Sequence, residues 1–299
     1  MRGVITGASG FVGKNLQQYL SYKKIDFTQI NLRENDVLTE IEKPDEFVVH
    51  LAGKAHDLKQ TASSGEYYKV NTELTQKVFD AFLASEAHTF ITISSVKAVA
   101  DSVTDELAED ALPDPKTHYG KSKLLGEQYI LTQKLPEGKR VYILRPCMIH
   151  GPGNKGNLNL LFSIVKKGLP WPLASFSNKR SFLTVENLCF VIHELLKRSD
   201  IPSGIYHVAD NNALSTNELI NLISQTLGLT PRLWKFPRPI VALVARAGSV
   251  LHLPLNSERL QKLTESYVVN TEKLLKVLKK PLPVSAEDGL RKTIQSFAE

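Results

Sequence analysis

A tyrosine and a lysine one helical turn apart are the residues of this chain best suited to acid–base chemistry. In the run Tyr119-Gly120-Lys121-Ser122-Lys123, the spacing places Tyr119 and Lys123 on one face of a predicted helix. A free tyrosine has a pKa of about 10 and is a poor base at neutral pH, but a lysine ammonium ~4–6 Å away favours the phenolate. The pair therefore predicts proton transfer at a substrate oxygen. A surface tyrosine beside an ordinary helical lysine would show the same spacing.

A glycine-rich turn near the N-terminus predicts a second site, which binds phosphate groups. The run from Thr6 to Gly13 follows an apolar strand and opens a helix. Gly7 permits a tight turn, Gly10 lets the backbone approach a pyrophosphate, and Gly13 lets the helix pack closely on the sheet. The free N–H groups of a helix N-terminus then bind phosphates. We therefore expect a dinucleotide whose contacts here are Gly7, Ser9, Gly10, Phe11, Val12 and Gly13. A glycine-rich turn without a ligand is the alternative.

The choice between the two nicotinamide dinucleotides depends on the end of the second strand. NAD-binding chains usually carry an acidic residue about 20 residues after the glycines, whereas a nearby arginine accommodates the 2′-phosphate of NADP. The run Ile30-Asn31-Leu32-Arg33 has no carboxylate there. Arg33 therefore favours NADP(H), unless it is only a solvated loop residue, and Asp36 and Val37 are expected to frame the adenine.

The elements that position these residues alternate between strands and helices, which predicts an α/β fold with a Rossmann-type, doubly wound parallel sheet. We expect strands at 4–6, 27–32, 46–51, 90–93 and 141–144, and helices at 11–20, 67–85 and 119–133. After residue 150 the pattern changes to loop clusters at 151–157 and 168–172, a strand at 205–208, and helices at 216–227 and 285–297. We interpret residues 1–150 as an NAD(P)-binding domain, to which 181–210 returns. Residues 151–299 then form mainly a smaller, mixed α/β substrate-binding domain.

Composition places few limits on function. The chain has 299 residues, a formal net charge of +6 and two distant cysteines, Cys147 and Cys189. This cysteine usage fits a reducing compartment, and the start of the chain is too short in apolar residues for a signal peptide. We therefore expect a cytoplasmic protein without a metal. No membrane partner is expected, because Arg246, His252 and Pro254 interrupt the apolar stretch from Ile240 to Leu255 and leave no spanning segment. No nucleic-acid partner is expected, because the lysines are scattered and lack a nucleic-acid motif.

Taken together, these motifs resemble the extended short-chain dehydrogenase/reductases, in the NAD-dependent epimerase/dehydratase family. The resemblance covers nearly the whole chain and rests, beyond the glycine turn, on His50-Leu51-Ala52-Gly53, Val70-Asn71, Ser94-Ser95, Tyr119-x-x-x-Lys123, Arg145-Pro146 and Arg180 to Asn187. It implies that Ser95 hydrogen-bonds the reacting sugar oxygen, Tyr119 is the acid/base and Lys123 holds the nicotinamide ribose. Leu51, Ala52, Gly53 and Asn71 would contact or position the cofactor. Arg180 would bind the diphosphate of a UDP-sugar, with Lys54, Asn157 and Arg259 as further substrate-binding candidates. A surface ion pair is the alternative for Arg180.

One departure from the family narrows the reaction. Sugar-nucleotide 4,6-dehydratases carry an Asp-Glu pair directly after the position of Ser95, and these carboxylates eliminate water. Here the two residues are Val96 and Lys97, so a dehydratase is disfavoured. The remaining chemistry is hydride transfer at C4 of the sugar. We expect a 4-epimerase of a UDP-hexose or UDP-N-acetylhexosamine, or alternatively an NADPH-dependent 4-ketoreductase of a UDP-4-keto-6-deoxy-N-acetylhexosamine in surface-polysaccharide biosynthesis.

Other readings stay open at this point. A non-sugar carbonyl reductase of the same family would lack the diphosphate-binding arginine, and a non-catalytic NADP-sensing regulator would generally lack Tyr119 or Lys123. The helices predicted at 67–85 and 119–133 resemble those that form a dimer interface in the family, which implies a homodimer.

Overall fold

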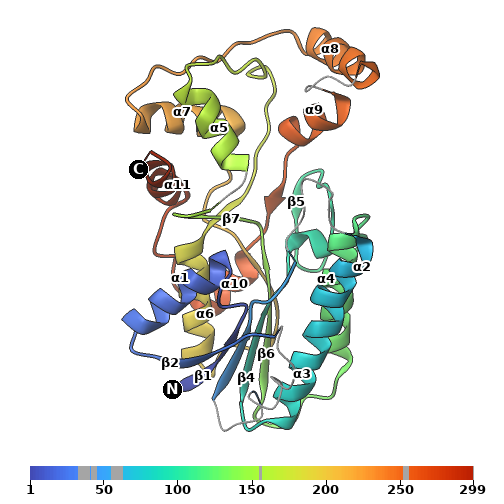
Figure 1. Cartoon of the computed structure of the whole chain (residues 1–299), viewed down its shortest axis with the longest axis vertical. Helices are drawn as coiled ribbons and strands as arrows, with labels where there is room; N and C mark the ends of the chain where they lie inside the picture. The colour runs from blue at the N-terminus through green and yellow to red at the C-terminus, as the bar shows by residue number, and fades with distance from the viewer. Residues whose placement is uncertain (33–40, 42–45, 55–62, 155–156, 252–255, 299) are drawn as a thin grey trace.

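A six-stranded parallel sheet forms the base of the molecule (Figure 1). The structure, a computed structural model, describes residues 1–32, 41, 46–54, 63–154, 157–251 and 256–298. Within these residues the strand order is β2-β1-β3-β4-β6-β9. The strands are β1 (Arg2–Thr6), β2 (Asp26–Ile30), β3 (Phe47–His50), β4 (Thr89–Ile93), β6 (Arg140–Pro146) and β9 (Gly204–Val208). The chain leaves β1 towards β2 and then returns to the other side of β1 with β3. This reversal is the point at which doubly wound sheets bind ligands.

Helices cover both faces of the sheet (Figure 1), which explains why its central strands are almost wholly buried. On one face lie α1 (Phe11–Tyr22), α6 (Val185–Lys197) and α10 (Glu272–Leu278); on the other lie α2 (Ser64–Tyr68), the π-helical turn η2 (Lys69–Glu73), α3 (Leu74–Ala84) and α4 (His118–Thr132). Alternate residues of one strand enter the two cores. Val49 packs in the core with α1 and α6, whereas Val48 packs in the core with α3.

The helix α10 belongs to the first of these cores although it lies close to the end of the chain. Its Leu274 and Leu278 are buried in the same cluster as the residues of α6. Lys273 donates a hydrogen bond to the carbonyl of Ile205 in β9. The core on this face of the sheet is therefore completed by a helix that begins more than sixty residues after the end of β9.

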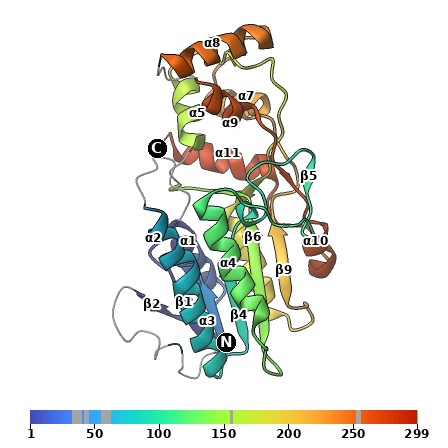
Figure 2. The same ribbon diagram turned by 90° about the vertical axis from the view of Figure 1, so that its right-hand side faces the viewer.

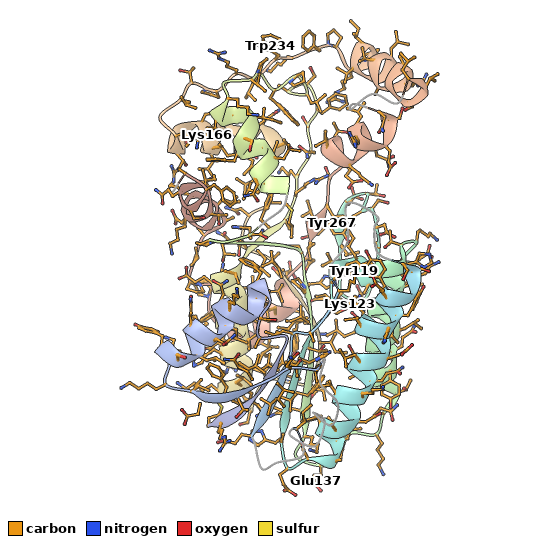
Figure 3. The ribbon with its side chains drawn as sticks, viewed as in Figure 1. Tyr119, Lys123, Glu137, Lys166, Trp234 and Tyr267 are labelled. Carbon is orange, nitrogen blue, oxygen red and sulfur yellow. The ribbon has the colours of Figure 1, made fainter. Side chains whose placement is uncertain are left out.

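A second lobe lies beyond the carboxyl ends of the strands (Figures 1 and 2). Its core is formed by α5 (Asn157–Lys166), α7 (Thr216–Thr226), α8 (Arg238–Val250), α9 (Ser257–Thr264) and α11 (Ala286–Ser296). Three short elements lie between the lobes: the strand pair β7 (Met148–His150) with β8 (Phe182–Thr184), the pair β5 (Glu106–Leu107) with β10 (Val268–Val269), and the 3-10 turn η3 (Val96–Ala98). Trp234 in the second lobe and Glu137 below the sheet mark opposite ends of the molecule (Figure 3).

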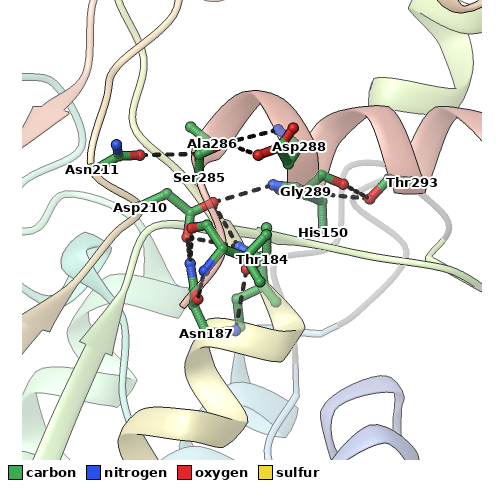
Figure 4. Close-up of polar contacts among 12 residues, drawn as sticks. His150, Thr184, Asn187, Asp210, Asn211, Ser285, Ala286, Asp288, Gly289 and Thr293 are labelled. Carbon is green, nitrogen blue, oxygen red and sulfur yellow. Dashed lines mark hydrogen bonds and ion pairs between the residues drawn. The ribbon is translucent and has the colours of Figure 1, made fainter. Parts of the chain in front are cut away.

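A buried polar network joins the two lobes (Figure 4). Asp210 accepts hydrogen bonds from the backbone N–H of Thr184, at 2.9 and 3.1 Å, and from the amide of Asn187, at 2.7 Å. His150 lies 3.7 Å from the same carboxylate and hydrogen-bonds Thr293 of α11 at 3.0 Å. Because buried polar groups are costly when unpaired, this network fixes α11 against the strands below it.

The predicted fold class is confirmed, and most predicted elements exist within a few residues of their expected bounds. The helix expected at 67–85 is instead divided into α2, η2 and α3, because the π-helical turn around Asn71 inserts an extra residue. The helices α6 and α8 were not predicted. The domain boundary at residue 150 stays a prediction. Both cysteines are free and buried, and no helix among the described residues has the length and apolar character of a membrane span.

The packing of α1 on β1 gives the first testable prediction. A Cβ at Gly13 would lie 2.4 Å from the carbonyl oxygen of Gly7 and 2.6 Å from that of Ala8. Both are backbone atoms, so they cannot give way without moving the turn. Gly13→Ala should therefore lower the free energy of unfolding by about 1–3 kcal/mol, measured by urea denaturation. Gly65→Ala, where nothing lies within 4 Å of the added Cβ, is the control and should be nearly neutral. Equal effects of the two substitutions would contradict the prediction.

Candidate active site

The glycine-rich turn has the geometry of a phosphate-binding loop. Gly7 has a φ of +70°, and a Cβ there would lie 2.4 Å from the backbone nitrogen of Ala52. Gly10 is the N-cap of α1 and is exposed, without a side-chain cap, and the first turn of α1 has no acidic residue. The N–H groups at this helix end therefore point to a surface that an anion can approach. The turn fits the pyrophosphate of a dinucleotide.

The other predicted cofactor contacts surround this turn. Ser9 is exposed, while Phe11 and Val12 are half-buried against the core below α1. Leu51 and Ala52 are half-buried directly after β3, and Gly53 is exposed. Arg33, Asp36 and Val37 lie outside the described residues, so the preference for NADP(H) stays a prediction.

Asn71 ties the loop after β3 to the catalytic helix α4. Its side-chain oxygen accepts a hydrogen bond from the backbone N–H of Lys54 at 2.8 Å. Its amide nitrogen donates to the carbonyl of Lys54 at 3.1 Å and to the hydroxyl of Ser122 at 3.0 Å. Ser122 in turn donates to the carbonyl of Tyr119 at 2.8 Å. Asn71 is thus a positioning residue, and the π-helical turn places it there.

Ser95 and Tyr119 come together from separate elements, the end of β4 and the first turn of α4. The Ser95 hydroxyl hydrogen-bonds the Tyr119 side chain, and the ring of Tyr67 packs edge-on against Tyr119 with 6.1 Å between centroids. Burial raises the pKa of Tyr119, and the hydrogen bond with Ser95 opposes this effect. Lys123 is not among the causes of this shift, so the lowering of the Tyr119 pKa expected beside Lys123 stays a prediction for the enzyme with its cofactor. The phenol is protonated at neutral pH and poised to donate.

Lys123 lies beside Tyr119 on α4, near the junction of the two lobes (Figure 3). Its ammonium donates to the carbonyl of Ile93 at 2.9 Å, and a Cβ at Gly53 would lie 2.9 Å from Nζ. A larger residue at 53 would therefore displace the Lys123 ammonium. Burial lowers the pKa of Lys123 to about 8, against the opposing effect of Glu127.

Glu127 forms a buried ion pair directly below Lys123. Its carboxylate accepts from Arg145 of β6, with Nη2 at 2.5 Å and Nε at 3.0 and 3.1 Å, and it accepts from the hydroxyl of Ser94. The two charged side chains are 2% and 3% exposed. The pair fixes α4 against β4 and β6, and so fixes the height at which Tyr119 and Lys123 project from the sheet.

The position of the missing dehydratase carboxylate is filled by a cation. Lys97 donates to the carbonyl of Asp101 at 2.6 Å and lies 4.1 Å above the ring of Tyr267. The Tyr267 hydroxyl donates to the carbonyl of Ala100 at 2.7 Å and lies 3.2 Å from that of Val96, next to Ser95. Burial lowers the pKa of Lys97, and the nearby carboxylates of Glu265 and Asp101 oppose this effect. No carboxylate stands at 96 or 97 to eliminate water.

Arg180 is paired within the protein. Its backbone pairs with that of Tyr267 in an isolated β-bridge, and its guanidinium donates to the carbonyls of Glu265 and Lys262. The Glu265 carboxylate lies 3.5 Å away, and both side chains are about one quarter exposed. The residue thus reaches the segment next to the loop of Ser95. Arg180 thus forms the ion pair that was the alternative interpretation of this residue, although both side chains remain partly accessible to solvent.

The remaining substrate candidates lie on three separate segments of the chain. Lys54 pairs with Glu66 of α2 at 2.6 Å. Arg259 lies exposed on α9, where its backbone N–H is capped by Asn256. Asn157 begins α5, and its side chain lies outside the described residues.

Two positioning features were missed at the sequence level. Thr117 caps α4 by accepting from Gly120, and Asp101 accepts from the hydroxyl and the backbone N–H of Thr117. Glu127 was missed as well, although its spacing of four from Lys123 placed it on the same helix face. A polar residue at a helix start and a charged residue as the third member of the Tyr119–Lys123 repeat were the available signals.

Comparison with known proteins assigns the family. The model of the NAD dependent epimerase/dehydratase family matches residues 4–209, from β1 to the end of β9. The chain belongs to the NAD-dependent epimerase/dehydratase family. This confirms the resemblance, the prediction of an enzyme and the prediction of NAD(P) as its cofactor.

Relatives within this family include both an epimerase and a reductase. The chain is 27% identical to a UDP-glucose 4-epimerase of Vibrio cholerae, covering 99% of this chain and 95% of that protein. It is 28% identical to a GDP-6-deoxy-D-mannose reductase of Pseudomonas aeruginosa, covering 74% of this chain and 78% of that protein. The fold matches the crystal structure of UDP-N-acetylglucosamine 4-epimerase from Bacillus cereus with a TM-score of 0.79 at 19% identity, covering all of both chains.

The buried ion pair gives a prediction on stability. Glu127→Gln should lower the free energy of unfolding by about 3–5 kcal/mol, because Arg145 is left as an uncompensated buried charge. The double variant Glu127→Leu with Arg145→Met should recover much of this loss. Urea denaturation measures both, with Glu73→Gln on the exposed side of η2 as control. A loss no larger than that of the control would show that the pair is not needed.

Lys123 gives a prediction on pH dependence. Folded Lys123 loses its proton near pH 8, whereas in the unfolded chain it keeps the proton up to about pH 10.4. Between these values the unfolded state binds more protons, so this group adds stability as the pH rises. The unfolding free energy of the wild type minus that of Lys123→Met should therefore increase from pH 7 to pH 10, in the absence of nucleotide. Lys121→Met controls for the loss of an exposed lysine. A constant difference would be inconsistent with a depressed pKa.

Proposed function

We propose that this enzyme is a nucleotide-sugar 4-epimerase that acts on a UDP-hexose or UDP-N-acetylhexosamine. The observation that carries the proposal is the meeting of Ser95 and Tyr119, with Lys123 one turn along the same helix, beside a site without a carboxylate at 96 or 97. Such a site can move a proton and a hydride at a carbinol but cannot eliminate water. The similarity of almost the whole chain to a UDP-glucose 4-epimerase supports the same reaction.

The proposed roles combine the resemblance to the family with the positions of these residues. Ser95 hydrogen-bonds the C4 oxygen of the sugar, and Tyr119 exchanges a proton with that oxygen through its phenol. Lys123 contributes its positive charge beside Tyr119 and holds the ribose next to the nicotinamide. NAD(P), bound at the glycine turn, would accept the hydride from C4 and return it to the other face of the keto sugar. Asn71 and Gly53 keep Lys123 and the loop after β3 in register for this exchange.

Arg180 is the proposed contact for the diphosphate. A guanidinium suits this role because its planar donors bind phosphate oxygens in pairs. The Glu265 carboxylate is the anion that it contacts in the protein alone, at 3.5 Å. A diphosphate carries more charge than a carboxylate and can take its place, with Lys97 and Lys262 close enough to act electrostatically on the same region.

A 4-ketoreductase is the second candidate, with Tyr119 as its proton donor. A buried phenol with a raised pKa is a proton donor, which is what the reduction of a 4-keto sugar requires. In this reaction only the return half of the epimerase cycle occurs, with NADPH as the reductant. The relative that acts as a GDP-6-deoxy-D-mannose reductase is consistent with such chemistry in the family.

One experiment separates the two candidates. The purified enzyme is incubated with UDP-N-acetylglucosamine or UDP-glucose and NAD⁺, and separately with a UDP-4-keto-6-deoxy-N-acetylhexosamine and either NADPH or NADH, and the products are identified by NMR. Formation of the C4 epimer without added reductant supports the epimerase. Reduction of the keto sugar without any epimerisation assigns the ketoreductase instead, and faster turnover with NADPH supports the role of Arg33. Absence of both reactions would contradict a UDP-sugar substrate.

The role of Tyr119 is tested by removing a single oxygen atom. Tyr119→Phe should keep the fold and the cofactor affinity but lose at least about two orders of magnitude in turnover, as expected for a positioned acid/base. Ser95→Ala should lose less, because a water molecule can replace its hydrogen bond. Turnover is measured at saturating substrate, with Tyr67→Phe as the control for a neighbouring phenol. Near-normal turnover of Tyr119→Phe would rule out its assignment.

The role of Arg180 is tested by direct binding. Arg180→Ala should weaken the binding of UDP by about 1.5–3 kcal/mol, the range for hydrogen bonds to charged groups, and leave cofactor affinity unchanged. Arg180→Lys should recover part of the loss, since it keeps the charge without the planar donors. Calorimetric titration measures each variant, with Arg232→Ala in the second lobe as control. Wild-type affinity for UDP in Arg180→Ala would leave the diphosphate without its proposed contact.

A further inference from the structure

The helix α8 is apolar on the side that faces solvent. Ile240, Leu243, Val244 and Val250 are 54%, 68%, 51% and 76% exposed, at spacings of three, four and seven that place them together. Its opposite side is already used. The buried stripe of Val241, Ala245 and Gly248 packs towards the rest of the second lobe. The exposed residues are therefore an additional apolar face, which we call the α8 face.

The segment that leads into α8 carries two exposed aromatic rings. Trp234 and Phe236 are 52% and 42% exposed and pack edge to face, with 5.9 Å between ring centroids. Trp234 lies at the far end of the second lobe, away from the sheet (Figure 3). Trp171, the other tryptophan of the chain, is 5% exposed. An exposed indole beside exposed aliphatic side chains is typical of the interface between water and lipid.

Charge identifies the kind of surface that fits the α8 face. Residues 219–257 contain no aspartate or glutamate. They contain Arg232, Lys235, Arg238 and Arg246, all of which are exposed. Within residues 219–257 the apolar helix face is accompanied only by cations, and such a segment attracts a surface that is both apolar and negatively charged.

We propose that the α8 face and the loop of Trp234 dock this enzyme on an anionic lipid bilayer. The helix would lie in the plane of the interface, with its apolar side chains among the lipid chains and its arginines at the headgroups. It spans nothing, since it has only 13 residues. The proposal differs from the expectation of no membrane partner, which rested on the lack of a spanning segment. It is independent of the sugar on which the enzyme acts.

A second copy of the chain fits the α8 face less well than lipid does. In a symmetric dimer the same patch meets itself, so the cations that flank α8 would approach their own counterparts. Within residues 219–257 no carboxylate is present to pair with them. Anionic headgroups remove this repulsion.

The first test measures binding to vesicles. The enzyme is mixed with vesicles of phosphatidylcholine alone, or of phosphatidylcholine with phosphatidylglycerol, and bound protein is measured by sedimentation. We expect binding to the anionic vesicles, weakened by high salt. Tryptophan emission should shift to the blue on binding, and this shift should disappear in Trp234→Phe, because buried Trp171 does not change its surroundings. No sedimentation with anionic vesicles would overturn the proposal.

The second test uses substitutions that leave the core intact. Leu243→Glu with Val250→Glu should lower the vesicle partition coefficient at least about tenfold, since two exposed aliphatic side chains that would enter the lipid become charged. Leu112→Glu is the matched control, because Leu112 is 93% exposed and lies in the loop before α4. The control should bind vesicles as the wild type does. Equal losses in both variants would show that added charge, rather than the α8 face, is responsible.

Light scattering after size-exclusion chromatography tests whether a second copy of the chain, rather than lipid, covers the α8 face. If the wild type ignores vesicles, and Leu243→Glu with Val250→Glu lowers its oligomeric mass, a second copy covers the α8 face and the lipid proposal is wrong. An unchanged mass in the variant, together with loss of vesicle binding, supports lipid. Because epimerase or reductase activity is not a readout in either test, failure of the proposed function leaves their outcome unaffected.

Discussion

The catalytic arrangement depends on one buried ion pair. Glu127 and Arg145 join α4 to β6 where both are shielded from water, and Ser94 adds a hydrogen bond from β4. A charge buried in this way is tolerated only while its partner remains. The helix therefore cannot slide or rotate along the sheet without separating them. Lys123 and Tyr119, one and two turns before Glu127, are held at fixed positions above the strand ends, where Ser95 emerges from β4.

Much of this arrangement was predictable because it follows from local spacing. The glycine turn requires a backbone that only glycine adopts without strain, so its residues identify the strand, turn and helix together. The Tyr119–Lys123 spacing likewise fixes a helix face. Residues that act across the fold were harder to predict. Asp101 holds Thr117 from sixteen residues away, and Asn187 contacts Val284 from ninety-seven residues away. No periodic pattern in the sequence carries such contacts.

The pKa shifts in the site also depend on the fold more than on the residue types alone. The sequence identified a lysine that could lower the pKa of a tyrosine. In the folded chain burial has the larger effect on both, raising the pKa of Tyr119 and lowering that of Lys123. Arg180 was identified as a phosphate ligand, but its partner Glu265 lies eighty-five residues along the chain. The free energy of ionisation of a side chain depends on such neighbours, which a sequence motif does not include.

The place of α10 in the sheet core has a consequence for the synthesis of the chain. A protein is synthesised from its N-terminus, and its early segments begin to fold while later ones are still being made. The core around α6 and β9 is closed by Leu274 and Leu278, and Arg198 at the end of α6 donates to the carbonyls of Val277 and Leu278. A nascent chain that stops short of these residues leaves open to water the part of this core that Leu274 and Leu278 cover. The sheet core, whose first strands are translated first, is therefore among the last parts of the molecule to become complete.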